Sequence, residues 1–446
     1  MTILYATPEK LAQDANLIGT LKSLSRRKKL SRFVFDEAHC VDTWGRSFRY
    51  DYCEMKRIRE TFPDVPILAC TATATKEIRN NIFADLCLDE HKTIKVLSSV
   101  ARANLEFRVV PKRQSTATKD ICELIQKEFV GQTGIIYCAT VKQCGTLCKE
   151  MKLKFKVDVA EYHGGLAGET RDKVQESWME GTPLVLVATV AFGMGVNKKD
   201  VRFVIHYSMP RSLESYYQEA GRAGRDGKRA VCVLFYNWND KLLCQMLTAR
   251  NLSGSSYKDR SAKDLLNMLR YCEEEYDCRH QFLVRFLDGT DGSDQQCATL
   301  VTMCDNCRRT LHKADDTAEL EDDCTDVAKY VVSMLSSLKC SGSGGGDGGG
   351  EAHKKYTMRQ LSEMIFAKKR KRFASDDEKV DINLLPPQTR NWNPQQRLEF
   401  MRKMTLKELL IEEIRDPCSV QAIGYVDCGP KAIALMTGEI NFSFHC

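Results

Sequence analysis

Two apolar runs, each followed by a glycine-containing segment, constrain this chain more than any other feature of its sequence. The run at 184–188 is short and continuously apolar, which is typical of a buried parallel strand. It leads into Thr189 and the glycine-spaced run AFGMG at 191–195, where the backbone can approach a phosphate closely. A second apolar run follows at 201–206. The spacing predicts two neighbouring strands with ligand-binding loops at their ends.

The second run is followed by a helix-like segment that ends in QEAGRAGRDG at 218–227. Arg222 and Arg225 are three residues apart among small residues, and they form a fork suited to a polyphosphate. A glycine- and arginine-rich run alone is equally typical of a solvated loop, but AFGMG shortly upstream favours the phosphate site. Together the two segments resemble motifs V and VI of superfamily-2 helicases, and specifically those of the RecQ family.

Bulk composition describes an ordinary globular chain of 446 residues, 43% hydrophobic and 28% charged. Its net charge of +6 permits a nucleic-acid partner without requiring one. The 20 cysteines come without a secretory signal pattern, and many stand singly in apolar runs, which predicts a reducing compartment. Because no apolar run approaches the ~18 residues that span a bilayer, we expect no membrane association.

A carboxylate pair follows the apolar run at 33–35, where the sequence reads DEAH at 36–39. The carboxyl end of a buried strand is where α/β folds place ligand chemistry. Asp36 is expected to hold the Mg²⁺ of a nucleotide, and Glu37 to orient the attacking water. His39 completes this candidate catalytic set. The plain alternative is an acidic loop after a strand.

The next segment, CVDTWGRSFRYDY at 40–52, disfavours that alternative because it resembles the aromatic-rich loop that RecQ enzymes place beside the DEAH box. The matching positions, Trp44, Phe48 and Arg49, have the aromatic and cationic character that suits stacking on single-stranded bases. The segment departs from the family pattern at three positions, Arg46, Ser47 and Tyr50. After it, the threonine-rich run TATAT at 71–75 resembles motif III.

The resemblance also assigns residues in the second half of the nucleotide site. It implies that Arg222 and Arg225 reach the γ-phosphate, and that Gln218 links the nucleotide to the DNA. Asp200 is expected to contact the nucleotide or to order the AFGMG loop. Two further residues belong to the segment that resembles motif V. Gly195 is expected to contact the nucleotide, and Thr189 is expected to contact the DNA.

One expected motif is absent, because no G-x-x-x-x-G-K-[ST] run occurs in the 446 residues. The family carries that phosphate-binding loop upstream of the segment where this chain begins. The residues before 101 are also few for a complete RecA-like lobe. We therefore expect an amino-terminally truncated Bloom-type RecQ helicase, in preference to a natural form that does not hydrolyse ATP.

A cysteine cluster distinguishes the region after the second lobe. Cys278, Cys297, Cys304 and Cys307 end in the C-x-x-C run CDNC, and four thiolates with this closing spacing predict a tetrahedral structural Zn²⁺ site. The pattern resembles the RecQ zinc subdomain. Cys272 is a competing ligand. A site closed by four cysteines leaves no open coordination, so the metal is expected to be structural.

The carboxyl-terminal region is predicted to contain an amphipathic helix at 322–338, a helix at 393–415 and a hairpin of strands at 422–426 and 431–435. This pattern resembles the RecQ winged helix, whose hairpin separates a duplex. The basic run at 368–372 favours phosphate contact or nuclear import over a solvated helix end. Its candidate DNA contacts are Lys368, Lys369 and Arg370.

These observations predict an α/β fold in four parts. The parts are an incomplete first RecA-like lobe (1–100), a complete second RecA-like lobe (101–245), a helical zinc-binding subdomain (246–315) and a winged helix (316–446), with a glycine-rich insertion at 341–350.

The resemblance implies a nuclear, ATP- and Mg²⁺-dependent 3′–5′ DNA helicase. Its expected substrates are single-stranded, forked and four-way-junction DNA, and its expected partners are repair and recombination proteins. Two alternatives stay open. One is a non-hydrolysing DNA-binding protein, favoured by the missing phosphate loop. The other is an RNA-directed ATPase of superfamily 2, which the zinc and winged-helix segments disfavour.

Overall fold

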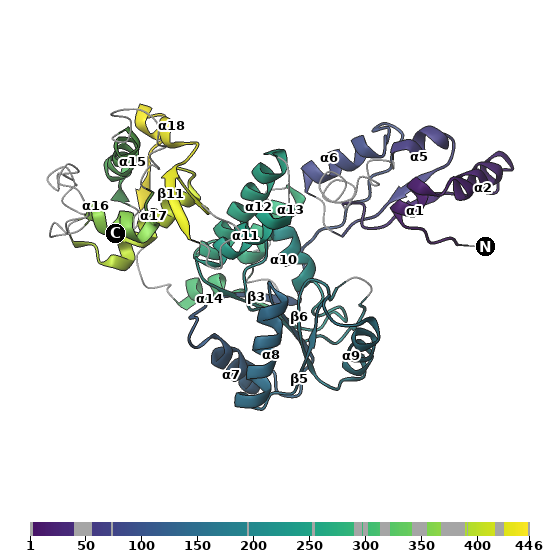
Figure 1. Cartoon of the computed structure of the whole chain (residues 1–446), viewed down its shortest axis with the longest axis horizontal. Helices are drawn as coiled ribbons and strands as arrows, with labels where there is room; N and C mark the ends of the chain where they lie inside the picture. The colour runs from purple at the N-terminus through teal and green to yellow at the C-terminus, as the bar shows by residue number, and fades with distance from the viewer. Residues whose placement is uncertain are drawn as a thin grey trace, which may run out of the picture. The chain divides into compact units, whose positions relative to one another are not determined.

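The protein forms two compact units in a computed structural model (Figure 1). The first comprises Met1–Asn237 with Leu252–Leu311, and the second Trp238–Asn251 with His312–Cys446. The structure describes residues 3–39, 56–72, 75–193, 196–251, 255–289, 297, 302–312, 322–340, 355–366, 389, 391–414 and 423–444. In the described parts, no helix is long and apolar enough to cross a membrane.

A six-stranded parallel sheet organises the first unit, in the order β3-β8-β7-β4-β6-β5. Its strands are β3 (Leu105–Pro111), β4 (Gly134–Tyr137), β5 (Val159–Tyr162), β6 (Val185–Ala188), β7 (Phe203–His206) and β8 (Ala230–Tyr236). Every residue of β4, β6 and β7 is buried, as expected for strands covered on both faces. The predicted parallel α/β lobe is therefore confirmed.

Helices connect these strands and cover the sheet, namely α7 (Ala117–Glu128), α8 (Val141–Phe155), α9 (Gly168–Glu180) and α10 (Leu213–Ala220) (Figure 1). Helix α8 packs on β5 and β6 and beside α7. Its start is fixed by Thr140, whose side chain accepts a hydrogen bond from the Gln143 amide. Because β4, β6 and β7 are parallel neighbours, the loops at their carboxyl ends meet at one edge of the sheet.

The amino-terminal segment contributes a two-stranded parallel sheet of β1 (Phe33–Phe35) and β2 (Ile67–Ala69). The helices α1 (Pro8–Gln13), α2 (Ala15–Arg26), α5 (Lys56–Thr61) and α6 (Lys76–Asp85) accompany it. Val34 and Leu68 pair across the sheet and are 57% and 47% exposed, so one face of this small sheet is largely uncovered.

The apolar run of Ile3, Leu4 and Tyr5 predicts a strand, but this prediction is wrong because these residues lie outside any strand. Their apolar side chains are exposed, with Tyr5 90% accessible. Apolar character alone does not form a strand, since a strand also needs a neighbour for its backbone hydrogen bonds. Among the described residues, none pairs with this segment.

Three helices follow the large sheet within the first unit: α12 (Ser255–Glu273), α13 (Arg279–Asp288) and α14 (Asp305–His312). Helix α11 (Asp240–Asn251) groups instead with the second unit. There, the buried Lys241 ammonium pairs with Glu412, and Lys241 also lies 3.9 Å from the centre of the Trp238 ring. The boundary expected at residue 245 therefore falls inside a helix.

The second unit contains α15 (Thr325–Cys340), α16 (Met358–Phe366), α17 (Pro394–Leu406) and α18 (Ala432–Thr437). A short antiparallel pair joins β9 (Asp322–Asp323) to β12 (Ser443–Phe444), and a longer one joins β10 (Leu410–Ile414) to β11 (Gly424–Cys428). Four aromatic rings form its core, namely Phe366, Trp392, Phe400 and Phe444.

Two predictions for this unit are wrong in their details. The helix expected at 393–415 ends at Leu406, and Glu408 turns the chain with a φ of +64° before β10 begins. The hairpin expected between 422–426 and 431–435 is a strand followed by helix α18, and β11 pairs with β10 instead. In α18, Ala432 and Leu435 are buried three residues apart, which is helical spacing.

A buried carboxylate joins the large sheet to α14. Glu106 in β3 is 1% exposed and forms ion pairs with Arg108, Arg229 and Arg308 at 2.8, 2.6 and 2.6 Å. Burial alone would raise the pKa of Glu106, but the three guanidinium groups outweigh burial and lower this pKa to about 2. The ionised carboxylate therefore stabilises the fold.

We predict that Glu106→Gln lowers the free energy of unfolding by about 2 kcal/mol at neutral pH, because it removes the buried anion that three guanidinium groups share. A depressed carboxyl pKa stabilises the folded state above the ordinary glutamate pKa, and this contribution is lost as pH falls toward about 2. The difference from wild type, measured by urea unfolding, should therefore shrink below about pH 4.5.

Glu128→Gln is the matched control, because Glu128 pairs with Arg108 but its side chain is 45% exposed. We expect it to cost less than about 1 kcal/mol. Equal stability of Glu106→Gln and wild type at neutral pH would contradict the assignment.

Candidate functional site

The DEAH segment lies directly after strand β1, as its sequence predicts. Asp36 and Glu37 are both exposed at the end of this strand. The Asp36 carboxylate accepts a hydrogen bond from the Glu37 amide at 3.0 Å, and Glu37 has a φ of +49°. This left-handed turn is uncommon for a residue with a side chain, and such conformations concentrate at functional sites. The turn keeps both carboxylates accessible to a nucleotide and its Mg²⁺.

His39 connects this segment to helix α10. Its Nδ1 lies 2.9 Å from Thr71 Oγ1 and 3.3 Å from a Glu37 carboxylate oxygen, and its Nε2 lies 3.3 Å from the Gln218 side-chain nitrogen. Burial lowers the pKa of His39, although the Glu37 carboxylate opposes this shift. In a neutral ring with its proton on Nδ1, Nε2 accepts a hydrogen bond from Gln218. Two predicted site residues are thus in direct contact.

The two predicted arginines lie in the segment 221–228, which we call the arginine loop. Their guanidinium groups contact the backbone of the segment 191–197, the glycine loop, of which the structure describes all but residues 194 and 195. Arg222 donates to the carbonyl oxygen of Gly193, and Arg225 Nη1 donates to that of Val196 at 2.7 Å. The structure thus brings the two glycine-rich segments together, as their sequence implies.

The Arg222 guanidinium packs closely against Gly193 at the first of these contacts. A Cβ at Gly193 would collide with the Arg222 guanidinium. The Nε of Arg222 is buried and has no hydrogen-bond partner among the described residues. A buried donor in this state is costly, so an anionic ligand at this position would stabilise it.

The other predicted site residues differ in their surroundings. Asp200 is exposed and lies 3.5 Å from the Lys198 ammonium. Thr189 is 7% exposed, so a direct DNA contact by its side chain requires movement of this loop. The remaining predicted nucleotide and nucleic-acid residues lie outside the described residues, namely Trp44, Phe48, Arg49, Gly195, Lys368, Lys369 and Arg370.

A buried cluster of donors lies beside α13, where the sequence predicts zinc. The side-chain donor atoms of Cys278, His280, Cys297 and Cys304 all lie within 4.8 Å of one another. Three soft thiols and one imidazole in this spacing form a donor set that fits Zn²⁺. Cys307, the fourth predicted ligand, is half-buried and interacts with Cys304 and Cys278. The cluster therefore offers two donors for the fourth position.

His280 was not predicted from the sequence. Its Nε2 donates to the carbonyl oxygen of Leu105 at 2.8 Å, which turns Nδ1 toward Cys297 Sγ at 3.4 Å. A metal-binding histidine commonly donates its second ring nitrogen to a carbonyl in this way. The available signal was its position two residues after Cys278, but that spacing does not match a C-x-x-C or C-x-x-H pair.

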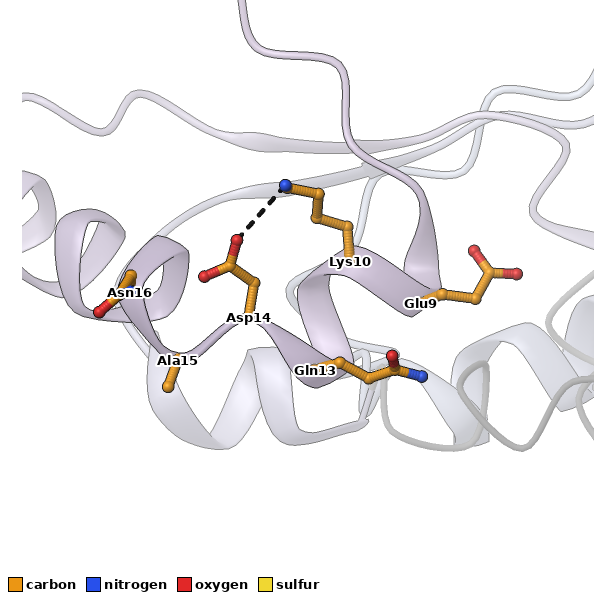
Figure 2. A pocket seen from close by; sticks show the side chains of 6 residues that line it. All are labelled: Glu9, Lys10, Gln13, Asp14, Ala15 and Asn16. Carbon is orange, nitrogen blue, oxygen red and sulfur yellow. Dashed lines mark ion pairs between the residues drawn. The ribbon is translucent and has the colours of Figure 1, made fainter.

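A shallow hollow at the junction of α1 and α2 is lined by Glu9, Lys10, Gln13, Asp14, Ala15 and Asn16 (Figure 2). Lys10 and Asp14 form an ion pair across it at 3.4 Å. It contains none of the predicted site residues, and we assign it no ligand.

Three family models match successive parts of the chain, and each part contains one of the sites described above. The DEAD/DEAH box helicase model matches residues 1–81, the helicase conserved C-terminal domain matches 116–227, and the RecQ zinc-binding model matches 239–308. The chain belongs to the RecQ family of helicases. The first matched segment contains the DEAH site, the second contains Arg222 and Arg225 of the arginine loop, and the third, which is specific to RecQ proteins, contains the buried thiol cluster.

Curated relatives support this RecQ assignment over most of the chain. It is 32% identical over 446 residues to the RecQ-like DNA helicase BLM of Xenopus laevis, covering 99% of this chain and 31% of that protein. It is 34% identical over 416 residues to the RecQ-like DNA helicase blm-1 of Caenorhabditis elegans, covering 92% of this chain and 40% of that protein. The chain thus spans less than half the length of these relatives.

We predict that the thiol cluster of this RecQ chain binds one zinc ion, and that Cys304→Ser loses it because Cys304 supplies a central, fully buried thiolate. Cys122→Ser is the matched control, because Cys122 is equally buried on α7 and lies outside the cluster. Zinc measured by atomic absorption should be equimolar in wild type and control. Retention of equimolar zinc by Cys304→Ser would contradict the assignment of Cys304 as a ligand, and its retention by a Cys297→Ser/Cys304→Ser double variant would show that the cluster is not the metal site.

Proposed function

We propose that this chain is the nucleotide- and DNA-binding core of a 3′–5′ DNA helicase of the RecQ family, driven by ATP hydrolysis. The observation that carries the proposal is the contact between the DEAH segment and α10 within one compact unit. His39 and Gln218 join the strand end that presents Asp36 and Glu37 to the helix that leads into the arginine loop. A helicase needs such a connection, because nucleotide state must alter the DNA-binding surfaces.

In this proposal, the residues divide the chemistry of ATP hydrolysis. Asp36 would hold the Mg²⁺ of the nucleotide, and Glu37 would orient the attacking water. Arg222 and Arg225 neutralise the charge that develops on the transferred phosphoryl group. Their guanidinium groups are planar, multiply donating and always charged, which suits phosphate oxygens. The contact between Gln218 and His39 links the DEAH carboxylates to helix α10, so that a change at the nucleotide alters the position of this helix.

We also propose how the second unit acts. Its helices α15, α16 and α17 and the antiparallel pair β10–β11 have the composition of a winged helix, with the hairpin available to a duplex. The names of these relatives describe DNA helicases, which favours DNA as the substrate. Forked and junction DNA as substrates and the nucleus as location are the finer parts of this proposal, and they come from the resemblance of the sequence motifs. Repair and recombination proteins are the partners that follow from this proposal.

The zinc site has a structural role in this proposal. Cys278, Cys297 and Cys304 supply thiolates, and Cys307 or His280 supplies the fourth ligand. Because Cys278 lies at the start of α13 and Cys304 just before α14, these ligands would link the two helix starts through a bound zinc ion. The metal would stabilise the helical segment and would take no part in catalysis.

One observation favours a second function, in which the chain grips DNA without hydrolysing ATP. The 446 residues contain no G-x-x-x-x-G-K-[ST] run, so any phosphate contacts of that type must come from elsewhere. The same zinc and winged-helix segments would then bind DNA on their own. Hydrolysis is therefore the property that separates the two functions.

We predict DNA-stimulated ATP hydrolysis by the chain, and a loss of at least about a hundredfold in Glu37→Gln, which removes the group that orients water. Glu60→Gln, at an exposed position on α5, is the matched control and should retain wild-type turnover. The assay compares phosphate release with and without a forked DNA. Tight binding of the fork without any turnover would favour the DNA-gripping function.

A further inference from the structure

The Arg102 side chain donates hydrogen bonds to the backbone of the arginine loop. The sequence did not identify Arg102 as a site residue. Its guanidinium nitrogens lie 3.4, 3.1 and 3.1 Å from three carbonyl oxygens of the loop, those of Gly221, Ala223 and Gly224. An irregular loop cannot satisfy its carbonyl groups by regular secondary structure, so they need donors from elsewhere. The planar arginine fork supplies several such donors from one side chain.

Asn104 completes this support two residues later. Its Nδ2 donates to the carbonyl oxygens of Gly224 at 2.8 Å and Lys228 at 2.9 Å, while its Oδ1 accepts from Arg102 Nε at 3.4 Å. Gly224 has a φ of +60°, and a Cβ there would collide with Asn104 Nδ2. The loop therefore rests directly on this amide, and only glycine permits the approach.

The two supporting side chains are themselves fixed to the large sheet. The Asn104 carbonyl oxygen accepts from the Ala230 amide at 3.0 Å, just where β3 begins to pair with β8. The Arg102 carbonyl accepts from the Leu105 amide at 3.0 Å. Because β8 follows the arginine loop in sequence, the same strand pair positions both the loop and the side chains that hold it.

Charge at the loop points to an anionic ligand. Burial lowers the pKa of Arg225, and the nearby positive charges of Arg222 and Arg102 lower it further. The carboxylate within the loop, Asp226, is engaged by Arg202 at 2.6 Å. The guanidinium groups of Arg102, Arg222 and Arg225 thus lie close together at this loop, and its one carboxylate already pairs with Arg202. A polyphosphate would relieve their mutual repulsion.

We propose that Arg102 and Asn104 are positioning residues for the nucleotide site, which hold the arginine loop so that Arg222 and Arg225 meet the phosphates of ATP. The proposal rests on the proposed function, because ATP supplies the polyphosphate. Arg102 acts through the loop backbone and through its charge, whereas Asn104 acts through the backbone alone.

The test combines amide hydrogen exchange with steady-state kinetics on the full chain. Arg102→Gln and Asn104→Leu each remove donors to the loop. Arg108→Gln is the matched control, because Arg108 lies a few residues later, on β3, and carries the same charge as Arg102 but contacts Glu106 and Glu128. The reporters are loop amides that are hydrogen-bonded in the structure, including those of Ala223, Gly224 and Gly227.

We expect exchange of these amides to accelerate by about tenfold or more in both variants, and by less than about twofold in the control. For DNA-stimulated ATP hydrolysis, kcat should fall by at least about tenfold while KM changes by less than about threefold. The reason is that Arg222 and Arg225 on a loosened loop still reach the phosphates of bound ATP but no longer align with the transition state. A purely structural role would lower thermal stability without this division between kcat and KM.

Loop exchange that stays at the wild-type rate, or that accelerates equally in the control, overturns the proposal. So does an unchanged kcat in both variants. Wild-type chain that hydrolyses no ATP contradicts the proposed function of this chain instead. In that case the exchange rates alone decide whether Arg102 and Asn104 hold the loop.

Discussion

Hydrogen bonds from arginine side chains to loop carbonyl groups are the interaction on which the site depends. Arg222 and Arg225 bind the glycine loop, and Arg102 binds the arginine loop. Backbone carbonyls satisfy these guanidinium groups only in part, as the buried Nε of Arg222 shows. They are neutral acceptors, and an anion makes stronger hydrogen bonds with the same donors. In the proposed function, phosphate would therefore compete directly with the contacts that hold the two loops together.

This competition gives nucleotide binding a way to reach the rest of the chain. When guanidinium groups turn from Gly193 and Val196 to phosphate, the glycine loop loses two of its contacts. That loop follows Thr189, which resembles a DNA-contacting position. On the other side, Gln218 precedes the arginine loop and contacts His39 beside the DEAH carboxylates. The arginine loop therefore lies between the hydrolytic residues and the loop expected at the DNA.

The second lobe and its site were largely predictable from sequence because their signals are local. Fully buried parallel strands read as continuous apolar runs, and ligand residues follow them at the carboxyl ends. The run at 184–188 became β6, the run at 201–206 became β7, and the arginine loop followed as expected. The thiols of Cys278, Cys297 and Cys304 also met as their spacing predicts.

What could not be predicted depends on partners distant in the sequence. Residues 3–5 are apolar enough for a strand, but they have no pairing neighbour among the described residues. Strand β11, at 424–428, pairs with the preceding strand β10 and not with the segment at 431–435. The turn residues between 426 and 431 gave no indication of this pairing. Arg102 and Asn104 contact a loop more than a hundred residues away, so their role has no local pattern.

The central claim is that the arginine loop binds the phosphates of a nucleotide. Its most direct test is calorimetric titration of Mg²⁺-ATP into wild type, an Arg222→Gln/Arg225→Gln double variant and Lys228→Gln, which changes an exposed charge of the same loop. We predict that the double variant binds at least about tenfold more weakly, whereas Lys228→Gln binds like wild type. Equal affinity in all three proteins, or no binding by wild type, would contradict the claim.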